Sequence, residues 1–328
     1  MLTEKENFIR ILDGEMPEFI PTYDRMGWGV NGNPFRPTEK TPEGYDIDEY
    51  GMVHKGNPES MGGVMPVPGR ILLDDITRWR DVIHTPDVDS VDWEKFSKEA
   101  LAKHDPNNPI SMGCGDYFLK LMNFMGVAEG LIALMEEPEE CYAMMEYLAD
   151  FYVAKLKKMI YYFKPDVLAL ADDIAAGERP FIRVETYREL VKPHHKRIAD
   201  LALDAGMRVT MHCCGKCDMF IDDWLDMGVS MWEPAQVTND LVGVKKKYGR
   251  KMAICGGWDN TGPISMPGVS DEELREALMK YTDTFAPDGG FVYMAHVAEG
   301  FGEEEYAHKM EICNDVYKNY ARNWYQTH

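Results

Sequence analysis

Four residues that can bind a metal or carry redox chemistry lie within one short segment, at His212, Cys213, Cys214 and Cys217. Side chains two positions apart on an extended strand share a face, and direct neighbours do not. His212 and Cys214 can therefore point together to one side of a sheet, while Cys213 faces the other side. Imidazole nitrogen and thiolate sulfur are both good zinc ligands. The spacing therefore predicts two ligands of one metal site.

Two other interpretations of this segment stay open from the residues alone. His212 and Cys214 could be polar groups packed in the protein interior. Cys214 and Cys217 also form a C-x-x-C spacing, which redox pairs and zinc ribbons use. A single C-x-x-C without a second pair is a weak signal, and its setting here is not that of thioredoxin. We expect Cys213 and Cys217 to take no part in the chemistry.

Two ligands do not hold a metal, so a third must come from the end of another strand. Three residues are candidates from their positions in the sequence: His296, Glu233 and Cys255. Each of them closes or follows a short apolar segment. The residues themselves do not choose among these three.

Carboxylates and one phenol also follow apolar segments, at Tyr23, Asp24 and the pair Asp172–Asp173. Only one aspartate of that pair should share a face with His212, because neighbours on a strand alternate. We expect Asp172 to do so, where it can hold a polar group of a substrate or orient a ligand histidine. The alternative role for Asp173 is to cap the next helix.

Seven short apolar segments bounded by turn residues predict the strands that position these side chains: 19–24, 109–115, 165–173, 207–215, 229–234, 251–259 and 291–298. Segments with helical periodicity lie between them. Strands beginning near 207, 229 and 251 are about 22 residues apart, enough for one strand and one helix. This spacing predicts an α/β fold, a single (β/α)8 TIM barrel over residues 1–328, whose chemistry lies at the carboxyl ends of the strands.

The stretch from about 28 to 95 differs from the rest, being rich in Gly, Pro and Asp. We expect it to contain the second barrel strand and a meander over the barrel mouth. Segments 51–56 and 62–69 predict a small hairpin there. A doubly wound sheet is the rival architecture, but no G-x-G-x-x-G follows the first expected strand.

Composition narrows the classes of function. With 328 residues and 45% hydrophobic content the chain can bury one large core. It has no run of about 18 apolar residues and no signal peptide, so we expect a soluble, cytoplasmic protein. A formal net charge of -21 argues against binding nucleic acid or an anionic membrane through a general electrostatic field. Seven cysteines without an export signal fit reduced thiols or metal ligands better than disulfides.

Five motifs, taken in their order along the chain, resemble the uroporphyrinogen decarboxylase superfamily. They are R-x-L-x-G-E-x-P-x-x-x-P from Arg10 to Pro21, DEYG at 48–51, PDVLALADDIA at 165–175, RELVKPHHKRI at 188–198 and WEPAQ at 232–236. The superfamily contains the decarboxylase itself and corrinoid-dependent methyltransferases, and the motifs resemble the methyltransferase-like branch. The resemblance covers almost the whole chain.

The first expected strand departs from the decarboxylase branch. That branch typically carries R-Q-A-G-R there, with arginines that hold substrate carboxylates. This chain has TYDRMGWG, with Arg25 alone. One arginine in a chain of net charge -21 is a poor receptor for a tetrapyrrole with eight carboxylates. Uroporphyrinogen decarboxylase activity is therefore not expected.

The resemblance to the zinc methyltransferases implies that His212 and Cys214 bind zinc. Their third ligand is a cysteine at the end of the last strand, where this chain has His296, which implies a His2Cys site. The implied activity moves a methyl group between a small methylated donor, such as an aryl methyl ether, and a corrinoid protein. Asp172, Tyr23 and Asp24 would contact the substrate, with Glu233 as a fourth or substitute ligand.

Several further expectations follow from the resemblance. The corrinoid would arrive on a separate protein, because the chain has no D-x-H-x-x-G motif for cobalamin. Dimers are common in folds of this type, so a homodimer is compatible with the chain. Two alternatives remain: a metal-free decarboxylase acting on another substrate, and a non-catalytic protein that binds a corrinoid protein or a tetrapyrrole.

Overall fold

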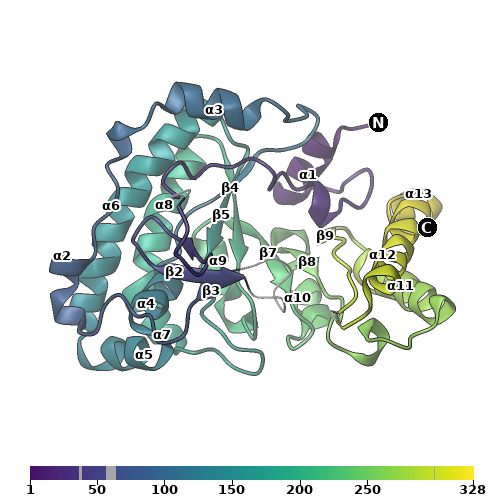
Figure 1. Cartoon of the computed structure of the whole chain (residues 1–328). Helices are drawn as coiled ribbons and strands as arrows, with labels where there is room; N and C mark the ends of the chain where they lie inside the picture. Colours follow the sequence, from purple (N-terminus) through teal and green to yellow (C-terminus); the bar gives the residue numbers. More distant parts are fainter. Residues whose placement is uncertain (37–38, 57–63, 299) are drawn as a thin grey trace.

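The computed structural model describes residues 1–36, 39–56, 64–298 and 300–328 (Figure 1). A six-stranded parallel sheet, in the order β4-β5-β6-β7-β8-β9, lies at its centre. Its strands are β4 (Ser111–Gly113), β5 (Val167–Ala171), β6 (Arg208–His212), β7 (Val229–Ala235), β8 (Ala253–Gly256) and β9 (Phe291–Val292). The α/β class and six of the seven expected strands are confirmed.

The sheet is buried on both faces, which explains the near-continuous apolar character of its strands. Leu168 and Leu170 of β5 belong to the larger hydrophobic cluster, between the sheet and its covering helices. Val167 of β5 belongs to a second cluster with Cys255 and Val292 of β8 and β9. Alternate residues of one strand thus serve two separate cores.

Helices connect successive strands and cover the sheet. The α-helices are α1 (Glu4–Leu12), α2 (Trp79–Val82), α3 (Trp93–Leu101), α4 (Phe118–Met125), α5 (Val127–Glu136), α6 (Pro138–Phe163), α7 (Val184–Thr186), α8 (Lys192–Asp204), α9 (Ile221–Asp226), α10 (Leu241–Tyr248), α11 (Asp271–Phe285), α12 (Glu303–Val316) and α13 (Trp324–Thr327). Capping boxes begin α1, at Thr3, and α11, at Ser270. Helices α6 and α8 pack side by side on the left of Figure 1.

None of the described helices alone is long and apolar enough to cross a membrane. The pair α4 and α5 meets that test only when the two are joined, and they meet at an angle of 116°.

The first expected strand, 19–24, contacts the β9 edge of the sheet without joining it as a strand, and the turn that follows it contacts the β4 edge. Thr22 forms a single parallel bridge with Tyr293, just beyond β9. At the other edge, the backbone N–H of Ser111 in β4 donates to the carbonyl of Gly27 (3.2 Å). In the described ranges the parallel sheet has six strands, so the eightfold count of a TIM barrel is not reached.

Residues 28–95 add no strand to the parallel sheet where the structure describes them. They form a separate antiparallel sheet of β1 (Asp46–Ile47), β2 (Val53–Gly56) and β3 (Val64–Pro66). Strands β2 and β3 pair as the expected hairpin, whose connecting residues 57–63 lie outside the described residues. Figure 1 shows this small sheet in front of α4 and the central strands.

Candidate metal centre

The site is built on the carboxyl ends of three neighbouring strands. His212 is the last residue of β6, and it is aligned with Ala171 of β5 on one side and Glu233 of β7 on the other. Parallel strands end together at one edge of a sheet, so residues that follow these positions meet there. The register therefore brings segments 172–173, 212–214 and 233–236 together.

Glu233 fixes the orientation of the His212 ring. Its buried carboxylate, 2% exposed, lies 3.0 and 3.1 Å from Nδ1 of His212 through its two oxygens. The opposite nitrogen, Nε2, lies 4.0 Å from the Cys214 sulfur and 4.0 Å from the carboxylate of Asp173. One ligand atom each from Asp173, His212 and Cys214 falls within 4.8 Å of the other two. This arrangement is the one that metal-binding histidines use, with the outer nitrogen bonded to a carboxylate.

The electrostatics of the site favour the charged ring of His212 and the neutral thiol of Cys214. Burial opposes the charged ring of His212, but hydrogen bonds to Cys214 and Glu233 raise its pKa to about 11. Burial raises the pKa of Cys214, and the hydrogen bond to His212 opposes that shift. Zinc competes with protons for the same nitrogen and sulfur, so binding the metal would release them.

A tight loop after β6 sets the position of Cys214. Its backbone N–H donates to Asp173 (2.7 Å), and the N–H of Gly215 donates to the side chain of Gln236 (2.7 Å). Gly215 has φ +91°, and a Cβ there would lie 2.4 Å from the carbonyl oxygen of Ala176. Only glycine fits this close approach in a left-handed conformation.

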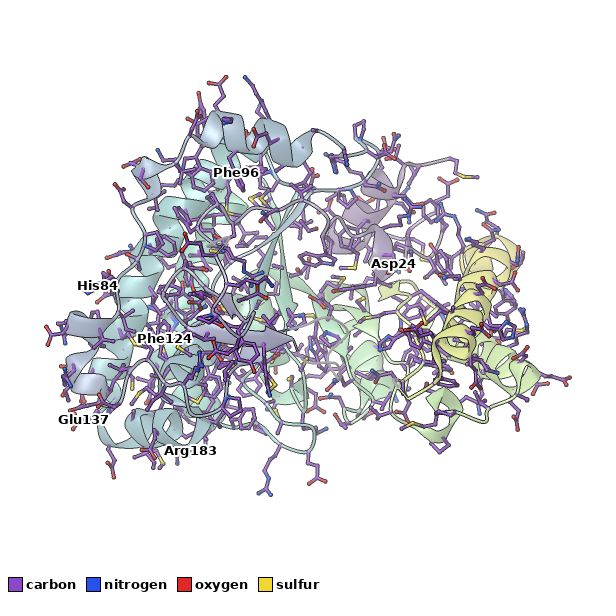
Figure 2. All side chains as sticks on the ribbon, viewed as in Figure 1. Asp24, His84, Phe96, Phe124, Glu137 and Arg183 are labelled. Carbon is purple, nitrogen blue, oxygen red and sulfur yellow. The ribbon has the colours of Figure 1, made fainter. Side chains whose placement is uncertain are left out.

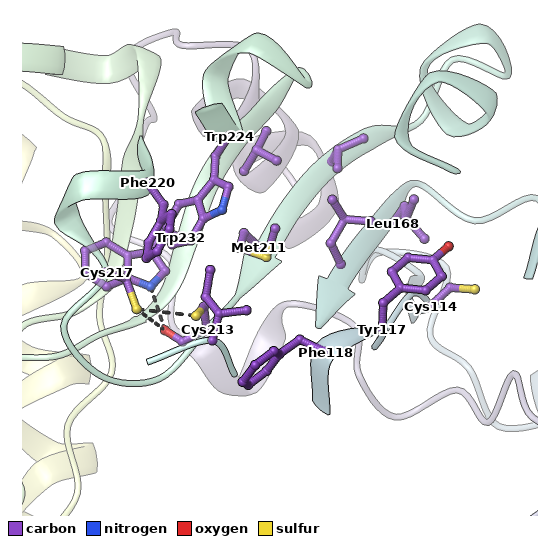
Figure 3. Close-up of a cluster of buried hydrophobic side chains, with 14 of the residues drawn as sticks. Cys114, Tyr117, Phe118, Leu168, Met211, Cys213, Cys217, Phe220, Trp224 and Trp232 are labelled. Atoms are coloured by element: carbon purple, nitrogen blue, oxygen red, sulfur yellow. Dashed lines mark hydrogen bonds between the residues drawn. The ribbon is translucent and has the colours of Figure 1, made fainter. Parts of the chain in front are cut away.

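Cys213 and Cys217 face away from the ligands, into the hydrophobic cluster around Trp232 (Figure 3). Their sulfurs lie 3.3 Å apart, and the Cys217 thiol also donates to the carbonyl of Cys214 (3.0 Å). The indole N–H of Trp232 donates to the carbonyl of Cys213 (2.8 Å). Cys217 thus meets the sulfur of Cys213 rather than that of Cys214, which does not support the C-x-x-C interpretation.

The two neighbouring aspartates divide their roles in the opposite way to the one expected. Asp172 is buried, and its carboxylate accepts the backbone N–H groups of Tyr117, Phe118 and Leu119 at 3.1, 2.9 and 2.6 Å. These groups lie at the start of α4, so Asp172 anchors a helix N-terminus. Burial raises the pKa of Asp172 even though His195 lowers it. It is Asp173 that faces His212.

His195 is a buried partner of Asp172, which the sequence did not reveal. Its Nε2 lies 3.3 Å from the Asp172 carboxylate and 2.9 Å from the carbonyl oxygen of Gly115. Nδ1 lies 3.2 Å from the hydroxyl of Tyr187. The position of His195 on the sheet-facing side of α8 is the signal that could have identified it.

His296 and Cys255, two candidates for the third ligand, lie outside the group of three. Nε2 of His296 accepts a hydrogen bond from the Asn260 amide (2.8 Å), and burial lowers the pKa of the ring. The Cys255 sulfur packs against the sulfurs of Met26 (3.9 Å) and Met294 (4.0 Å) in the second cluster. Glu233, the third candidate, contacts Nδ1 of His212 rather than the space that Nε2 faces.

Tyr23 and Asp24 lie in one turn of 3-10 helix that follows the Thr22 bridge. Burial raises the pKa of the Tyr23 hydroxyl, and the charge of Glu233 raises it further, so the phenol stays protonated near the site. Figure 2 shows Asp24 in the region between α1 and the C-terminal helices.

The donor atoms suit zinc. The group offers an imidazole nitrogen, a thiolate sulfur and a carboxylate oxygen, all of which bind Zn²⁺. Three protein ligands leave one position of a tetrahedral ion free, as catalytic zinc sites require. The Glu233 contact adds the outer carboxylate that such histidines have.

Comparison with known proteins gives the family. The model for uroporphyrinogen decarboxylase (URO-D) matches residues 101–295, more than half of the chain. The chain belongs to the uroporphyrinogen decarboxylase family. The resemblance that its motifs indicated is thereby confirmed. The match includes all of β4 to β9, and so every residue of the candidate centre.

Two relatives within this group are methyltransferases of Methanosarcina mazei. A methylated-thiol–coenzyme M methyltransferase is 28% identical over 162 residues, which cover 48% of this chain and 41% of that protein. A solved structure described as a methyltransferase shares the fold with a TM-score of 0.60 and 14% identity, over 97% of this chain and 100% of the other. The second likeness concerns the fold alone.

Proposed function

We propose that this member of the URO-D family is a zinc-dependent methyltransferase. It would move a methyl group between a small methylated donor, for example an aryl methyl ether, and a corrinoid carried by a partner protein. The observation that supports this most is the convergence of Asp173, His212 and Cys214, with Glu233 behind the histidine. The methylated-thiol–coenzyme M methyltransferase, 28% identical over part of the chain, adds support for methyl transfer.

We assign zinc to His212, Cys214 and Asp173. His296, implied by the resemblance, becomes the alternative third ligand, because Asn260 occupies its ring nitrogen. With thiolate and carboxylate each carrying one negative charge, this ligand set would balance the charge of the ion. Bound zinc would act as a Lewis acid on the donor's heteroatom and so improve it as a leaving group.

The residues of the chain would prepare the site for this reaction. Glu233 holds the His212 ring so that Nε2 faces the ligand space. Asp173 fixes Cys214 through its backbone N–H, which keeps the sulfur beside that space. The protonated Tyr23 hydroxyl can donate a hydrogen bond to the departing heteroatom, and Asp24 would contact the substrate near it. We assign Asp172 a structural role instead of substrate contact, because its carboxylate accepts backbone N–H groups at the start of α4.

Metal analysis of purified variants tests the ligand set. Wild-type protein should hold about one zinc per chain, and His212→Ala and Cys214→Ser should remove most of it. Asp173→Asn should lower zinc affinity, whereas His296→Ala should leave it near the wild-type value. Cys213→Ser serves as the matched control, since it changes the thiol beside Cys214 on the opposite face. A zinc content that falls only in His296→Ala would reject Asp173 as the ligand.

A second experiment tests the reaction itself. Protein is mixed with a methylated donor and a corrinoid protein in its reduced cob(I) state, and the cobalt spectrum is followed. Methyl transfer should convert the spectrum to that of methylcobalt and should stop when a chelator removes zinc. Chelator-insensitive loss of a carboxyl group from another substrate would instead favour the metal-free decarboxylase.

Further expectations about domain organisation, location and partners belong to the same proposal. Residues 1–328 would form one domain, working in the cytoplasm and able to pair as a homodimer. Neither nucleic acid nor a membrane is an expected partner, given the net charge of -21. Size-exclusion chromatography with light scattering would decide between monomer and dimer.

A further inference from the structure

A cavity of about 350 Å³, lined by several charged side chains, lies beside the candidate centre, between the small antiparallel sheet and the central strands. Gly113 of β4, Ala171 of β5 and His54 of β2 line it. Ala171 is aligned with His212, so the cavity lies one strand away from the metal ligands. Cavities of this size hold small organic molecules.

Lys155 is the unusual residue of its wall. The residue lies on α6, is only 5% exposed, and lines both this cavity and the next one. Within the described ranges, its ammonium group has no hydrogen-bond acceptor and no carboxylate within ion-pair distance. An ammonium group that keeps little contact with water and has no counter-ion is costly in free energy. An anion in the cavity would supply that counter-ion.

Other charged groups of the wall already have partners. The carboxylate of Asp48 accepts the backbone N–H groups of Tyr50 and Met52 (both 2.9 Å) and contacts His54 (3.1 Å). Asp116 accepts from the Tyr152 hydroxyl (2.6 Å) and pairs with Lys120 (3.2 Å). Among the buried cations of the wall, Lys155 is therefore the one left to bind a ligand, and the exposed Arg36 is a second cation that lines the cavity.

A second cavity, of about 280 Å³, adjoins the first and gives the ligand a second property. The two share Asn33, Gly113 and Lys155. The second wall carries four apolar side chains, those of Trp28, Val30, Met112 and Met159, together with polar groups. A molecule that fills both cavities would place its anionic group near Lys155 and an apolar or aromatic body along this wall.

We propose that the two cavities bind a small carboxylic acid with an apolar body, and that Lys155 is the counter-ion of its carboxylate. That this acid is also the methylated donor rests on the function proposed above. Binding itself does not, because Lys155 and the cavity walls are separate from the zinc ligands.

Isothermal titration calorimetry with two matched probes tests the proposal. The probes are 4-methoxybenzoate and the neutral 4-methoxybenzyl alcohol, titrated into the full chain without corrinoid protein. Wild type should bind the acid at least about tenfold more tightly than the alcohol. In Lys155→Met that preference should vanish while affinity for the alcohol stays the same. Lys157→Met, an exposed lysine on the same helix, is the control and should behave as wild type.

Three results would overturn the proposal: no binding of the acid, equal binding of acid and alcohol by wild type, or an unchanged preference in Lys155→Met. The wild-type comparison needs no variant, so a folding defect would leave it intact. Thermal melting adds an independent readout. Lys155→Met should melt no lower than wild type, because the change removes an unpaired buried charge. Failure of methyl transfer would alter none of these binding results.

Discussion

The carboxylate of Glu233 holds the His212 ring by Nδ1, at 3.0 Å, and so turns Nε2 toward Cys214 and Asp173. The two residues are aligned on neighbouring strands, so sheet register and side-chain contact fix the same geometry. A ring held in this way loses little freedom when a metal binds.

Glu233→Gln should therefore weaken zinc binding without unfolding the protein. The amide keeps the shape of the side chain but loses the charge that orients and polarises the ring, so we expect affinity to fall about 10- to 100-fold. Competition with a fluorescent zinc chelator measures this. Glu178→Gln, an exposed carboxylate in the loop after β5, is the control for net charge. Equal affinities in the two variants would remove Glu233 from the site.

Substitutions of Asp172 and Asp173 should affect the stability of the metal-free protein to different extents. Asp172→Asn replaces a buried carboxylate, which accepts three N–H groups at the start of α4, by a neutral amide. This substitution should lower the free energy of unfolding by about 3 kcal/mol. Asp173→Asn should cost less than about 1 kcal/mol in the metal-free protein, because an amide oxygen still accepts from Cys214. Urea denaturation of the metal-free variants provides both values. The reverse order would restore the roles first expected for this pair.

Gly215→Ala should displace Cys214. The substitution adds left-handed strain and a Cβ that would meet the Ala176 carbonyl at 2.4 Å, so we expect a loss of at least about 3 kcal/mol together with the zinc. Gly206→Ala is the matched control, since Gly206 has φ +82° with open space around its Cα. That variant should lose only about 1 kcal/mol and retain zinc. Similar losses of stability in the two would contradict the close approach at Gly215.

Stability should fall in weak acid because of His194. Burial lowers its pKa from 6.5 to about 4, and the ring is 3% exposed. Between these values the unfolded chain binds a proton that the folded protein does not. The contribution is thus fully present above pH 6.5 and is lost as the pH falls toward 4, by up to about 3 kcal/mol.

Urea melts at pH 7.5 and 4.5 measure this contribution when wild type is compared with His194→Gln. The variant should lose less stability on acidification. His84→Gln, which removes an exposed histidine, should keep the wild-type dependence on pH. If His194→Gln and wild type lose the same amount, protonation of His194 is not coupled to unfolding.

The fold could be predicted where one physical pattern dominates. Strands β4 to β9 are short apolar segments between turns, and burial on both faces demands that composition. The first expected strand, 19–24, has the same composition but makes only the Thr22 bridge before turning into 3-10 helix. Local sequence does not reveal how long a segment stays paired, because its neighbours in the sheet decide that.

The residue types of the candidate site could be predicted from the sequence, but which of two neighbouring residues faces the site could be predicted less well. Alternation selected His212 and Cys214 correctly as a pair on one face, and it also governs β5. Ala171 aligns with His212, so Asp173 shares that face and Asp172 points to α4. Choosing between the aspartates requires the register between two strands that lie 36 residues apart, and a single sequence does not contain it. The backbone contacts of Gly215 are likewise a product of the folded loop.

The three proposed ligands, the carboxylate behind His212 and the Gln236 side chain come from residues 173–236, on three adjacent strands and the turns that follow them. A metal centre whose ligands come from consecutive strands and loops can be moved into another protein as one segment. Three neighbouring parallel strands in an unrelated host, with a glycine at the place of Gly215, would supply the scaffold that the ligands need. A centre completed by His296 would instead require the host to reproduce the far edge of the sheet as well. To receive these residues, a designed α/β protein would thus need three parallel strands with the register of β5, β6 and β7.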